Sequence, residues 1–295
     1  MKSVREFFYL AKNVDVFSAI YYLYYKLALK IHNFSWVQSY RNRKDVWVDN
    51  IYAHLQVLNN DVEIVNGKKL LVLSPRKNHI NTVYLRPFSS DSLVYNQVLV
   101  QKNYLPVIEI YNQVFKTKPV NFMDLGANIG LTSLFFANYY DDLKIMAIEP
   151  FKENVEMAEL NMNANKLKGY KIIYGGVWNK NTRLSLNRNF RDGKEWGISL
   201  TEDPNGEIEG FSLEQLLDDL IAPIDFLKID IEGAEAELFK DQVYAAGFLK
   251  KVKCLVMEIH DEFKCRNAIY STLIQNDFIY YNILDLTIAV NRRYI

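Results

Sequence analysis

Residues 120–130 read Val-Asn-Phe-Met-Asp-Leu-Gly-Ala-Asn-Ile-Gly, and Leu-Thr-Ser-Leu-Phe-Phe-Ala follows at residues 131–137. An apolar segment that ends in an acid, a glycine-bearing turn and a helix-like run predict a buried strand, a tight turn and a helix start. This arrangement builds a small-molecule crevice at the carboxyl end of a parallel sheet. The turn is Gly-x-x-x-Gly and lacks the Gly-x-Gly-x-x-Gly of a dinucleotide fingerprint, so it does not indicate pyrophosphate binding.

A second apolar run lies at residues 143–148 and ends in Glu149 and Pro150. An acid at the end of the second strand of a β-α-β unit is placed to accept hydrogen bonds from a ribose diol. Together with Asp124 before the turn, this acid makes a pattern that is much more specific than the glycine turn alone. The alternative is an ordinary doubly wound domain with an acidic loop tip.

These residues resemble the class I S-adenosylmethionine-dependent methyltransferases. Three later stretches narrow the resemblance to the FkbM family: residues 226–235 (Phe-Leu-Lys-Ile-Asp-Ile-Glu-Gly-Ala-Glu), residues 211–217 before them, and residues 257–260 (Met-Glu-Ile-His) after them. The resemblance covers roughly residues 80–290. It implies an α/β, Rossmann-like class I methyltransferase fold, with a mostly parallel seven-stranded sheet, an antiparallel last strand and S-adenosylmethionine as cofactor.

The rhythm of apolar segments agrees with such a sheet, because strands that alternate with helices form parallel sheets covered on both faces. Strands are predicted to end near Asp124, Glu149, Tyr174, Lys228 and Glu258, and helices to occupy residues 129–140, 152–165, 212–221, 235–246 and 266–276. Residues 180–210 break the rhythm and predict an antiparallel insertion. Residues 278–290 predict a final pair of strands.

We divide the chain into three parts. Residues 1–60 form a helical N-terminal extension, residues 61–118 a small β and helical region, and residues 119–295 the S-adenosylmethionine-binding methyltransferase domain. The small β region contains a hairpin signal, with Asn66-Gly67 between two apolar runs, and a third strand near residues 82–86.

The resemblance also implies a cofactor site. Its expected residues are Asp124, Gly126, Ala127, Asn128, Gly130, Glu149, Pro150, Val177 and Asp230. Asp124 would bind the amino group of the cofactor directly or through water, Glu149 would bind the ribose hydroxyls, and Val177 would pack on the adenine ring.

Residues at the ends of the fourth and fifth strands would face the methyl group in this fold. They are Asp230, Glu232 and His260, which we take as the candidate catalytic residues. His260 is the candidate general base or acceptor-orienting group, because histidine titrates near neutrality; a loop histidine without a role is the alternative. Asp230 and Glu232 would orient the acceptor, or bind Mg²⁺ together with Glu258, or Glu232 would only cap the helix after Gly233.

The residues at the end of the fourth strand also indicate which chemical group is methylated. This strand end lacks the Asn/Asp-Pro-Pro-Tyr-like loop typical of amide and exocyclic-nitrogen methyltransferases, which argues against methylation of those groups. The resemblance points to a hydroxyl on a sugar, glycan or related natural product. Candidate substrate residues are Arg86, Asp91, Tyr104 and Trp196; surface pairing or packing is their alternative.

Composition narrows the function further. The chain has 35 basic and 35 acidic residues, so its formal net charge is zero, and we expect no nucleic-acid partner. Two cysteines form no disulfide framework and suit a reducing cytoplasm.

The aromatic-rich segment at residues 14–31 is interrupted by charged residues. Its uncharged stretch is therefore shorter than the about 20 apolar residues that a membrane-spanning helix needs. The segment predicts a helix that packs on the domain or a second subunit, rests on the inner face of the membrane, or covers the substrate.

The sequence therefore predicts a cytoplasmic S-adenosylmethionine-dependent O-methyltransferase that acts on a hydroxylated small molecule or glycan. A homo-oligomer and a peripheral membrane contact stay open. A non-catalytic scaffold that retains the fold is the alternative function. A nicotinamide-dependent oxidoreductase is disfavoured because the dinucleotide fingerprint is missing.

Overall fold

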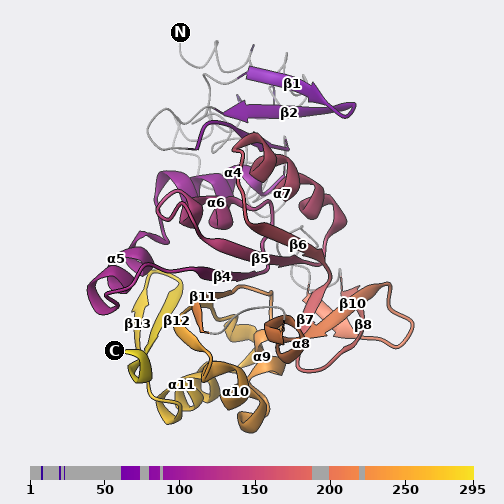
Figure 1. The fold of residues 1–295 in the computed structure, drawn as a ribbon. Helices are drawn as coiled ribbons and strands as arrows, with labels where there is room; N and C mark the ends of the chain where they lie inside the picture. Colours follow the sequence, from indigo (N-terminus) through magenta and orange to yellow (C-terminus); the bar gives the residue numbers. More distant parts are fainter. Residues whose placement is uncertain are drawn as a thin grey trace.

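The computed structural model describes residues 61–73, 80–86, 89–187, 199–218 and 223–295, together with Phe8, Ile20 and Leu23. Its centre is a seven-stranded sheet (Figure 1) with the spatial order β6 (Tyr170–Tyr174), β5 (Lys144–Glu149), β4 (Asn121–Leu125), β11 (Ile224–Ile229), β12 (Val252–Glu258), β14 (Leu286–Asn291) and β13 (Phe278–Ile283). The strands from β6 to β12 pair in parallel, and β14 runs antiparallel to both of its neighbours. The predicted mostly parallel sheet with a reversed last strand is confirmed.

Helices cover both faces of this sheet (Figure 1). One face carries α5 (Leu105–Val114), α6 (Leu131–Ala137) and α7 (Lys152–Ala164), and the other carries α8 (Leu213–Asp218), α10 (Gln242–Leu249) and α11 (Arg266–Gln275). Side chains of a strand alternate between the faces. Phe122 thus stacks on Phe136 of α6, with ring centroids 4.4 Å apart, while its neighbour Met123 belongs to the opposite core.

The single helix predicted at residues 235–246 is wrong. The structure has α9 (Glu235–Leu238) and, after a break, α10. The break is made by Asp241, whose carboxylate accepts hydrogen bonds from the backbone nitrogens of Val243 at 2.8 Å and Tyr244 at 3.3 Å. An aspartate in this geometry starts a new helix because it satisfies amide groups that have no partner within the helix.

A second, four-stranded sheet lies beside the end of β6. Its order is β7 (Gly176–Trp178), β10 (Ile208–Ser212), β8 (Thr182–Asn187) and β9 (Ser199–Glu202). Strands β8, β9 and β10 pair antiparallel, as predicted for residues 180–210. Residues 176–178 form a strand because they pair in parallel with β10. Trp196 lies outside the described residues.

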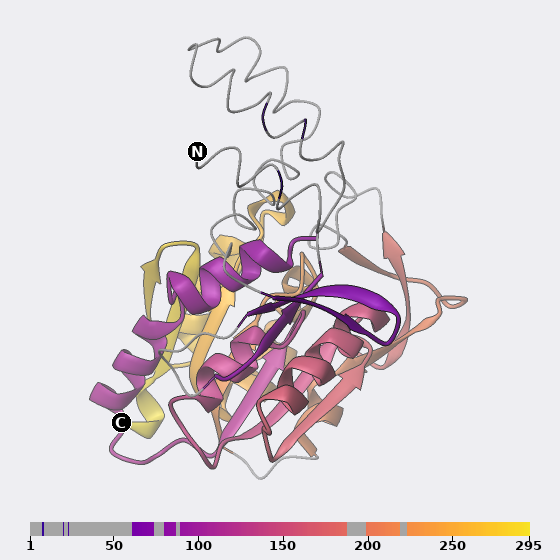
Figure 2. The same ribbon diagram turned by 90° about the horizontal axis from the view of Figure 1, so that it is seen from above.

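The small N-terminal sheet contains β1 (Asp61–Val65), β2 (Lys68–Leu73) and β3 (Val83–Leu85). Asn66 and Gly67 form the hairpin turn with φ of 51° and 75°. Positive φ at both central residues is what a tight turn of this twist requires. In Figure 2 this sheet lies over α7 and stays separate from the main sheet.

Asparagines of α7 hold the outer edge of β3. Asn165 accepts hydrogen bonds from the backbone nitrogens of Asn81 and Thr82 and donates one to the carbonyl of Thr82. Asn161 accepts from the nitrogen of Tyr84 and donates to its carbonyl. Four helical residues rise about 6.0 Å and two strand residues about 6.6 Å, so the two repeats match. These side chains therefore take the place of a neighbouring strand.

The chain reaches the core through a short helical segment. It consists of α4 (Asp91–Tyr95) and a π-helix, η1 (Asn96–Val100), and α5 follows. Two 3₁₀ turns, η2 (Asp261–Phe263) and η3 (Arg292–Tyr294), lie near the C-terminus. None of the helices within the described ranges combines the length and apolar character needed to cross a membrane. The aromatic segment at residues 14–31 is outside those ranges except for Ile20 and Leu23, and the division into three parts stays a prediction.

Candidate active site

The glycine turn after β4 brings three strand ends together. Gly126 has a φ of 80°, and a Cβ at this position would collide with the backbone carbonyl of Asp230. The nitrogens of Gly126 and Ala127 donate to the carbonyl of Ile148 at 2.9 and 3.0 Å. Only glycine allows both the left-handed conformation and this close approach. The turn thus fixes the carboxyl ends of β4, β5 and β11 around one point.

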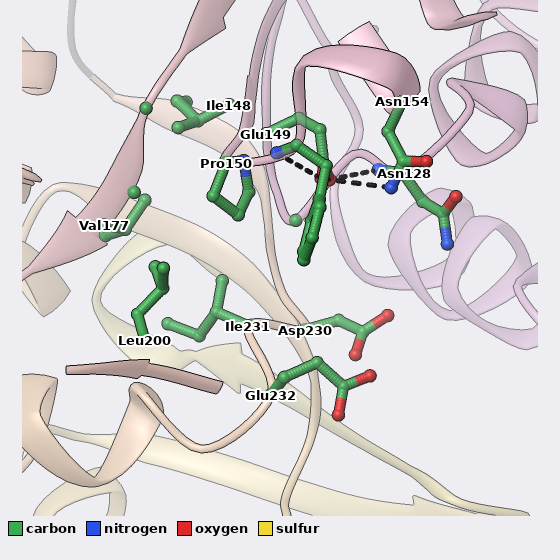
Figure 3. A pocket seen from close by; sticks show the side chains of 14 residues that line it. Asn128, Ile148, Glu149, Pro150, Asn154, Val177, Leu200, Asp230, Ile231 and Glu232 are labelled. Carbon is green, nitrogen blue, oxygen red and sulfur yellow. Dashed lines mark hydrogen bonds between the residues drawn. The ribbon is translucent and has the colours of Figure 1, made fainter. Parts of the chain in front are cut away.

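A cleft opens at this point, and Gly126, Glu149 and Asp230 are among the residues that line it. In Figure 3, Val177, Leu200 and Ile231 lie at one end, and Glu149, Asp230 and the other polar side chains lie toward the opposite end. An apolar end suits a flat ring, and a polar end suits hydroxyl and charged groups. Of the predicted cofactor residues, Gly126, Asn128, Glu149, Pro150, Val177 and Asp230 line this cleft.

Glu149 is held by donors on three sides. Its carboxylate accepts hydrogen bonds from the backbone nitrogens of Asn128 at 2.8 Å and Phe151 at 3.0 Å, and from the side-chain amide of Asn154 at 3.1 Å. Burial raises the pKa of Glu149 to about 7, although these donors oppose the shift. A carboxylate has about four acceptor positions. Glu149 therefore keeps one for a ligand hydroxyl in the cleft that it lines.

A second cavity lies behind the turn, between η1 and β11. Asn103, Tyr104, Ala127 and Thr132 line it together with Asn128. The side-chain oxygens of Asn103 and Asn128 are buried and have no hydrogen-bond partner among the described residues. Buried polar atoms normally have a hydrogen-bond partner, so these two oxygens are available to a polar ligand in the cavity. The structure therefore places Tyr104 and Ala127 at this cavity, as part of the same continuous site.

Lys228 was not predicted as a site residue, and it lies at the centre. Its ammonium nitrogen is 2.6 Å from the carbonyl oxygen of Gly126, 3.3 Å from Asp124 and 3.4 Å from Asp230. Burial lowers the pKa of Lys228, but the two carboxylates outweigh it and hold that pKa above its usual range. A lysine inside the apolar run 226–229 was the sequence signal for this pairing.

Two of the predicted cofactor residues act away from the cleft. Asp124 lies behind the turn, where it accepts a hydrogen bond from Ser133 at 2.7 Å and pairs with Lys228. It is therefore placed to position Lys228 and not to reach an amino group in the cleft directly. Gly130, with a φ of 79°, begins α6 and packs against Ala158.

His260 lies between two carboxylates. Its Nδ1 is 2.8 Å from Glu235, and its Nε2 is 3.3 Å from Glu232. Burial lowers the pKa of His260, but hydrogen bonds to Glu232 and Glu235 outweigh it and raise the pKa to about 11. The ring is therefore an imidazolium at neutral pH and cannot accept a further proton. The geometry supports the orienting role expected for His260 over the role of base.

Glu235 and the turn before it were missed by sequence reasoning. Glu235 is fully buried and accepts hydrogen bonds from the nitrogens of Gly233 and His260, both at 2.9 Å. Glu232 has a φ of 52° and Gly233 a φ of 100°. A non-glycine residue in the left-handed region is uncommon and strained, which is often found at functional sites. This turn aims Glu232 at His260.

The candidate metal ligands fit Mg²⁺ poorly. The atoms that lie within 4.8 Å of one another belong to Asp230, Glu232 and His260. Glu258, expected as the third oxygen ligand, is not in this group. Mg²⁺ demands oxygen ligands in nearly octahedral geometry, whereas this set includes an imidazole. We therefore derive no step through magnesium.

Arg86 and Asp91, expected to reach the substrate, line none of these cavities. The guanidinium of Arg86 donates two hydrogen bonds, of 2.7 and 3.0 Å, to the buried carboxylate of Asp91. A buried carboxylate needs such a partner, which explains why the pair faces inward. The pairing favours a structural role for both residues, and their contact with the substrate stays a prediction.

Comparison with known sequences identifies the family. The sequence profile described as the methyltransferase FkbM domain matches residues 124–280, which is 157 of the 295 residues. The chain belongs to the FkbM methyltransferase family. Among curated proteins, no sequence relative matches this FkbM-family chain.

Solved structures similar to the FkbM-family chain share little sequence with it. The monomeric protein WbdD has a TM-score of 0.41 at 12% identity, over 64% of this chain and 41% of that one. The methyltransferase FkbM from Methylobacillus flagellatus KT has a TM-score of 0.40 at 15% identity, over 68% and 54% of the two chains. Precorrin-6y C5,15-methyltransferase from Geobacter metallireducens GS-15 has a TM-score of 0.36 at 12% identity, over 63% and 86%. The chain thus spans about two fifths of WbdD and about half of the Methylobacillus protein.

Family membership and the sheet order confirm the predicted class I methyltransferase fold, and the family implies S-adenosylmethionine as the methyl donor. The residues present fit this cofactor. Gly126 and Glu149 line the cleft, and the buried side-chain oxygen of Asn128 lacks a hydrogen-bond partner within the described part of the chain. When bound, the cofactor supplies an electrophilic methyl group on a sulfonium.

Proposed function

We propose that this protein is an O-methyltransferase whose acceptor is a hydroxyl group of a sugar, a glycan or a related natural product. The observation that carries the proposal is the polar floor at the ends of β11 and β12. There Asp230, Glu232 and His260 gather next to the cofactor cleft. Methyl transfer is an in-line displacement, so the protein must hold an acceptor oxygen about 3 Å from the methyl carbon.

A cleft for the acceptor adjoins the cofactor cavities. It meets the cavity behind the turn at Glu258 and Leu286, which line both. Its wall carries His260, Asn282 and Thr287. A wall rich in hydrogen-bonding groups suits a polyhydroxylated acceptor better than an apolar one. This supports a sugar-like substrate.

Glu258 fits the role of proton acceptor. It lines both the acceptor cleft and the cavity behind the turn. Burial, followed by the neighbouring Asp230, raises the pKa of Glu258 to about 7. A general base works best when its pKa lies near the operating pH. In this proposal Glu258 accepts the hydroxyl proton, while imidazolium His260 holds Glu232 in place.

The cellular setting is also a proposal. The balanced charge and the two buried free thiols of Cys254 and Cys265 suit a cytoplasmic enzyme. In this proposal, residues 14–31 make the contact with the inner face of the membrane. Flotation of the protein with anionic vesicles, compared with a variant that lacks residues 1–60, tests that contact.

Calorimetric titration with S-adenosylhomocysteine, with and without Mg²⁺, comes first. We expect micromolar affinity and equal values in both conditions. Labelled methyl transfer from S-adenosylmethionine to a panel of neutral glycosides then tests the acceptor, with amines and nucleic acids as comparison substrates. Transfer to an amine or a nucleic acid but to no hydroxyl compound would refute O-methylation. Failure of the folded protein to bind the cofactor product would favour a non-catalytic scaffold.

A further inference from the structure

A line of hydrogen bonds connects the small N-terminal sheet to the cofactor cleft. It begins at Asp91, whose carboxylate binds the guanidinium of Arg86. Arg86 Nη2 donates to Asn154 Oδ1 at 2.7 Å, and Asn154 Nδ2 donates to Glu149 Oε1 at 3.1 Å. Glu149 then accepts from the backbone nitrogen of Asn128 in the glycine turn. Thus Arg86 and Asp91, which lie outside the cleft, are connected to the Glu149 carboxylate through the side-chain amide of Asn154.

Charge fixes the orientation of that amide. A guanidinium only donates hydrogen bonds, and an ionised carboxylate only accepts them. Asn154 can therefore satisfy both neighbours in one orientation only, with its oxygen toward Arg86 and its nitrogen toward Glu149. Without Arg86, the amide could rotate by half a turn and accept a hydrogen bond from a protonated Glu149. Arg86 removes that alternative.

The line is mostly buried, and Arg86 is its most exposed member, with 17% of its side chain accessible. Asp91, Asn154 and Glu149 are 0%, 4% and 3% exposed. Hydrogen bonds of this kind gain strength where water is excluded, and an unsatisfied member costs correspondingly more. Glu149 must carry its charge in a buried place, and Asn154 supplies one of its three donors. Loss of that donor would favour the protonated acid.

Strand β3 holds Arg86 in register with α7. The asparagines Asn161 and Asn165 bind the backbone of Tyr84 and Thr82, and Asn154 continues the same helix face toward Arg86. Asp91 accepts a further hydrogen bond from the backbone nitrogen of Arg86 at 2.8 Å. The guanidinium is therefore aimed by both its own backbone and its counter-ion, which is what a fixed positioning group requires.

We propose that Arg86 is a positioning residue for cofactor binding, which acts through Asn154 to keep the Glu149 carboxylate charged and directed at the ribose. This inference rests on the proposed use of the cleft for S-adenosylmethionine. It assigns to Arg86 and Asp91 a role without substrate contact. The N-terminal sheet thereby contributes to cofactor affinity although it lies outside the cofactor cleft.

The test is calorimetric titration with S-adenosylhomocysteine between pH 5.5 and 8.5. Asn154→Leu removes the amide but keeps the Arg86–Asp91 pair, so it is the variant most expected to fold. We expect affinity about tenfold weaker at pH 7.5, because a hydrogen bond to a charged group is lost. We also expect the pH at which affinity is half-maximal to rise by about one unit. Arg86→Met should shift both quantities in the same direction by a smaller amount.

Asn165→Leu is the matched control. It removes an asparagine from the end of the same helix and loosens the same strand, but Asn165 does not touch Glu149. Its melting temperature should fall while its pH profile matches that of the wild type. The inference is overturned if Asn154→Leu keeps the wild-type profile, or if Asn165→Leu shifts the profile equally. A wild-type protein that binds no S-adenosylhomocysteine at any pH would instead refute the cofactor site itself.

Discussion

The ammonium nitrogen of Lys228 lies 3.3 Å from Oδ1 of Asp124, and both side chains are almost completely buried. A buried pair contributes little net stability, but removal of one partner leaves an uncompensated charge. Lys228→Met should therefore lower the free energy of unfolding by about 3–5 kcal/mol. Urea denaturation measures this. Lys228→Met with Asp124→Asn should recover part of the loss, whereas equal losses in the single and double variants would contradict the pairing.

Lys253 offers a control for this prediction. It pairs with Asp225 at 2.7 Å, but Asp225 also accepts hydrogen bonds from Tyr111, Val120 and Asn121. Lys253→Met should therefore cost less stability and leave affinity for S-adenosylhomocysteine unchanged, because Asp225 lies away from the cleft. Lys228→Met should weaken that affinity, since Lys228 also holds the carbonyl of Gly126.

Gly126→Ala should damage both stability and cofactor binding. Its φ of 80° disfavours alanine, and the new methyl group would meet the carbonyl of Asp230. We expect a loss of about 3 kcal/mol or more in unfolding free energy. Gly67→Ala is the control, because Gly67 has a φ of 75° and open space around it. That variant should lose only about 1 kcal/mol. Similar losses of unfolding free energy in both variants would show that the left-handed backbone conformation accounts for the cost, without the contact to Asp230.

Cofactor affinity should depend on pH through Glu149. The pKa of Glu149 is raised to about 7, so the carboxylate is charged above this pH and protonated below it. A protonated acid loses an acceptor for the ribose hydroxyls, and affinity for S-adenosylhomocysteine should fall as pH drops through about 7. Glu149→Gln should bind weakly at every pH between 5.5 and 8.5. A wild-type affinity that rises at low pH would contradict the assignment.

His260→Gln should slow methyl transfer by at least about tenfold and change the dissociation constant for S-adenosylhomocysteine by less than about twofold. The reason is that His260 orients Glu232 near the acceptor and lines the acceptor cleft. Because the pKa of His260 is raised to about 11, the wild-type rate should show no histidine titration between pH 6 and 9.

The pKa of Glu258 is raised to about 7, so the wild-type rate should rise as pH increases through about 7. Glu258→Gln should abolish this rise. Wild-type activity in Glu258→Gln would exclude it as the base.

Local patterns in the sequence predicted the framework of the site. The acid, glycine turn and apolar strands around residues 120–150 are contiguous, and so are residues 226–235, so each can be read without knowledge of distant contacts. Gly126 and Glu149 were found this way. Their positions follow from strand ends, which the hydrophobic rhythm marks clearly.

The partners across the sheet could not be read in the same way. Lys228 meets the carbonyl of Gly126 across 102 residues, and Glu235 meets His260 across 25. The asparagines of α7 resemble a solvated helix face in the sequence, yet Asn154 and Asn161 are buried against Arg86 and Tyr84. In the sequence, a row of polar residues on one helix face predicts exposure to solvent. The hydrogen-bond partners that allow these residues to be buried come from distant parts of the chain.

The asparagine edge on α7 has a consequence for how this protein can change. On the N-terminal segment, Asn161 and Asn165 bind main-chain atoms of Tyr84, Thr82 and Asn81, which every residue type except proline presents equally. The attachment is therefore indifferent to the side chains of the attached strand. Different N-terminal modules could be exchanged on this helix without redesign of the docking surface, provided that an arginine stands at the end of the strand to meet Asn154.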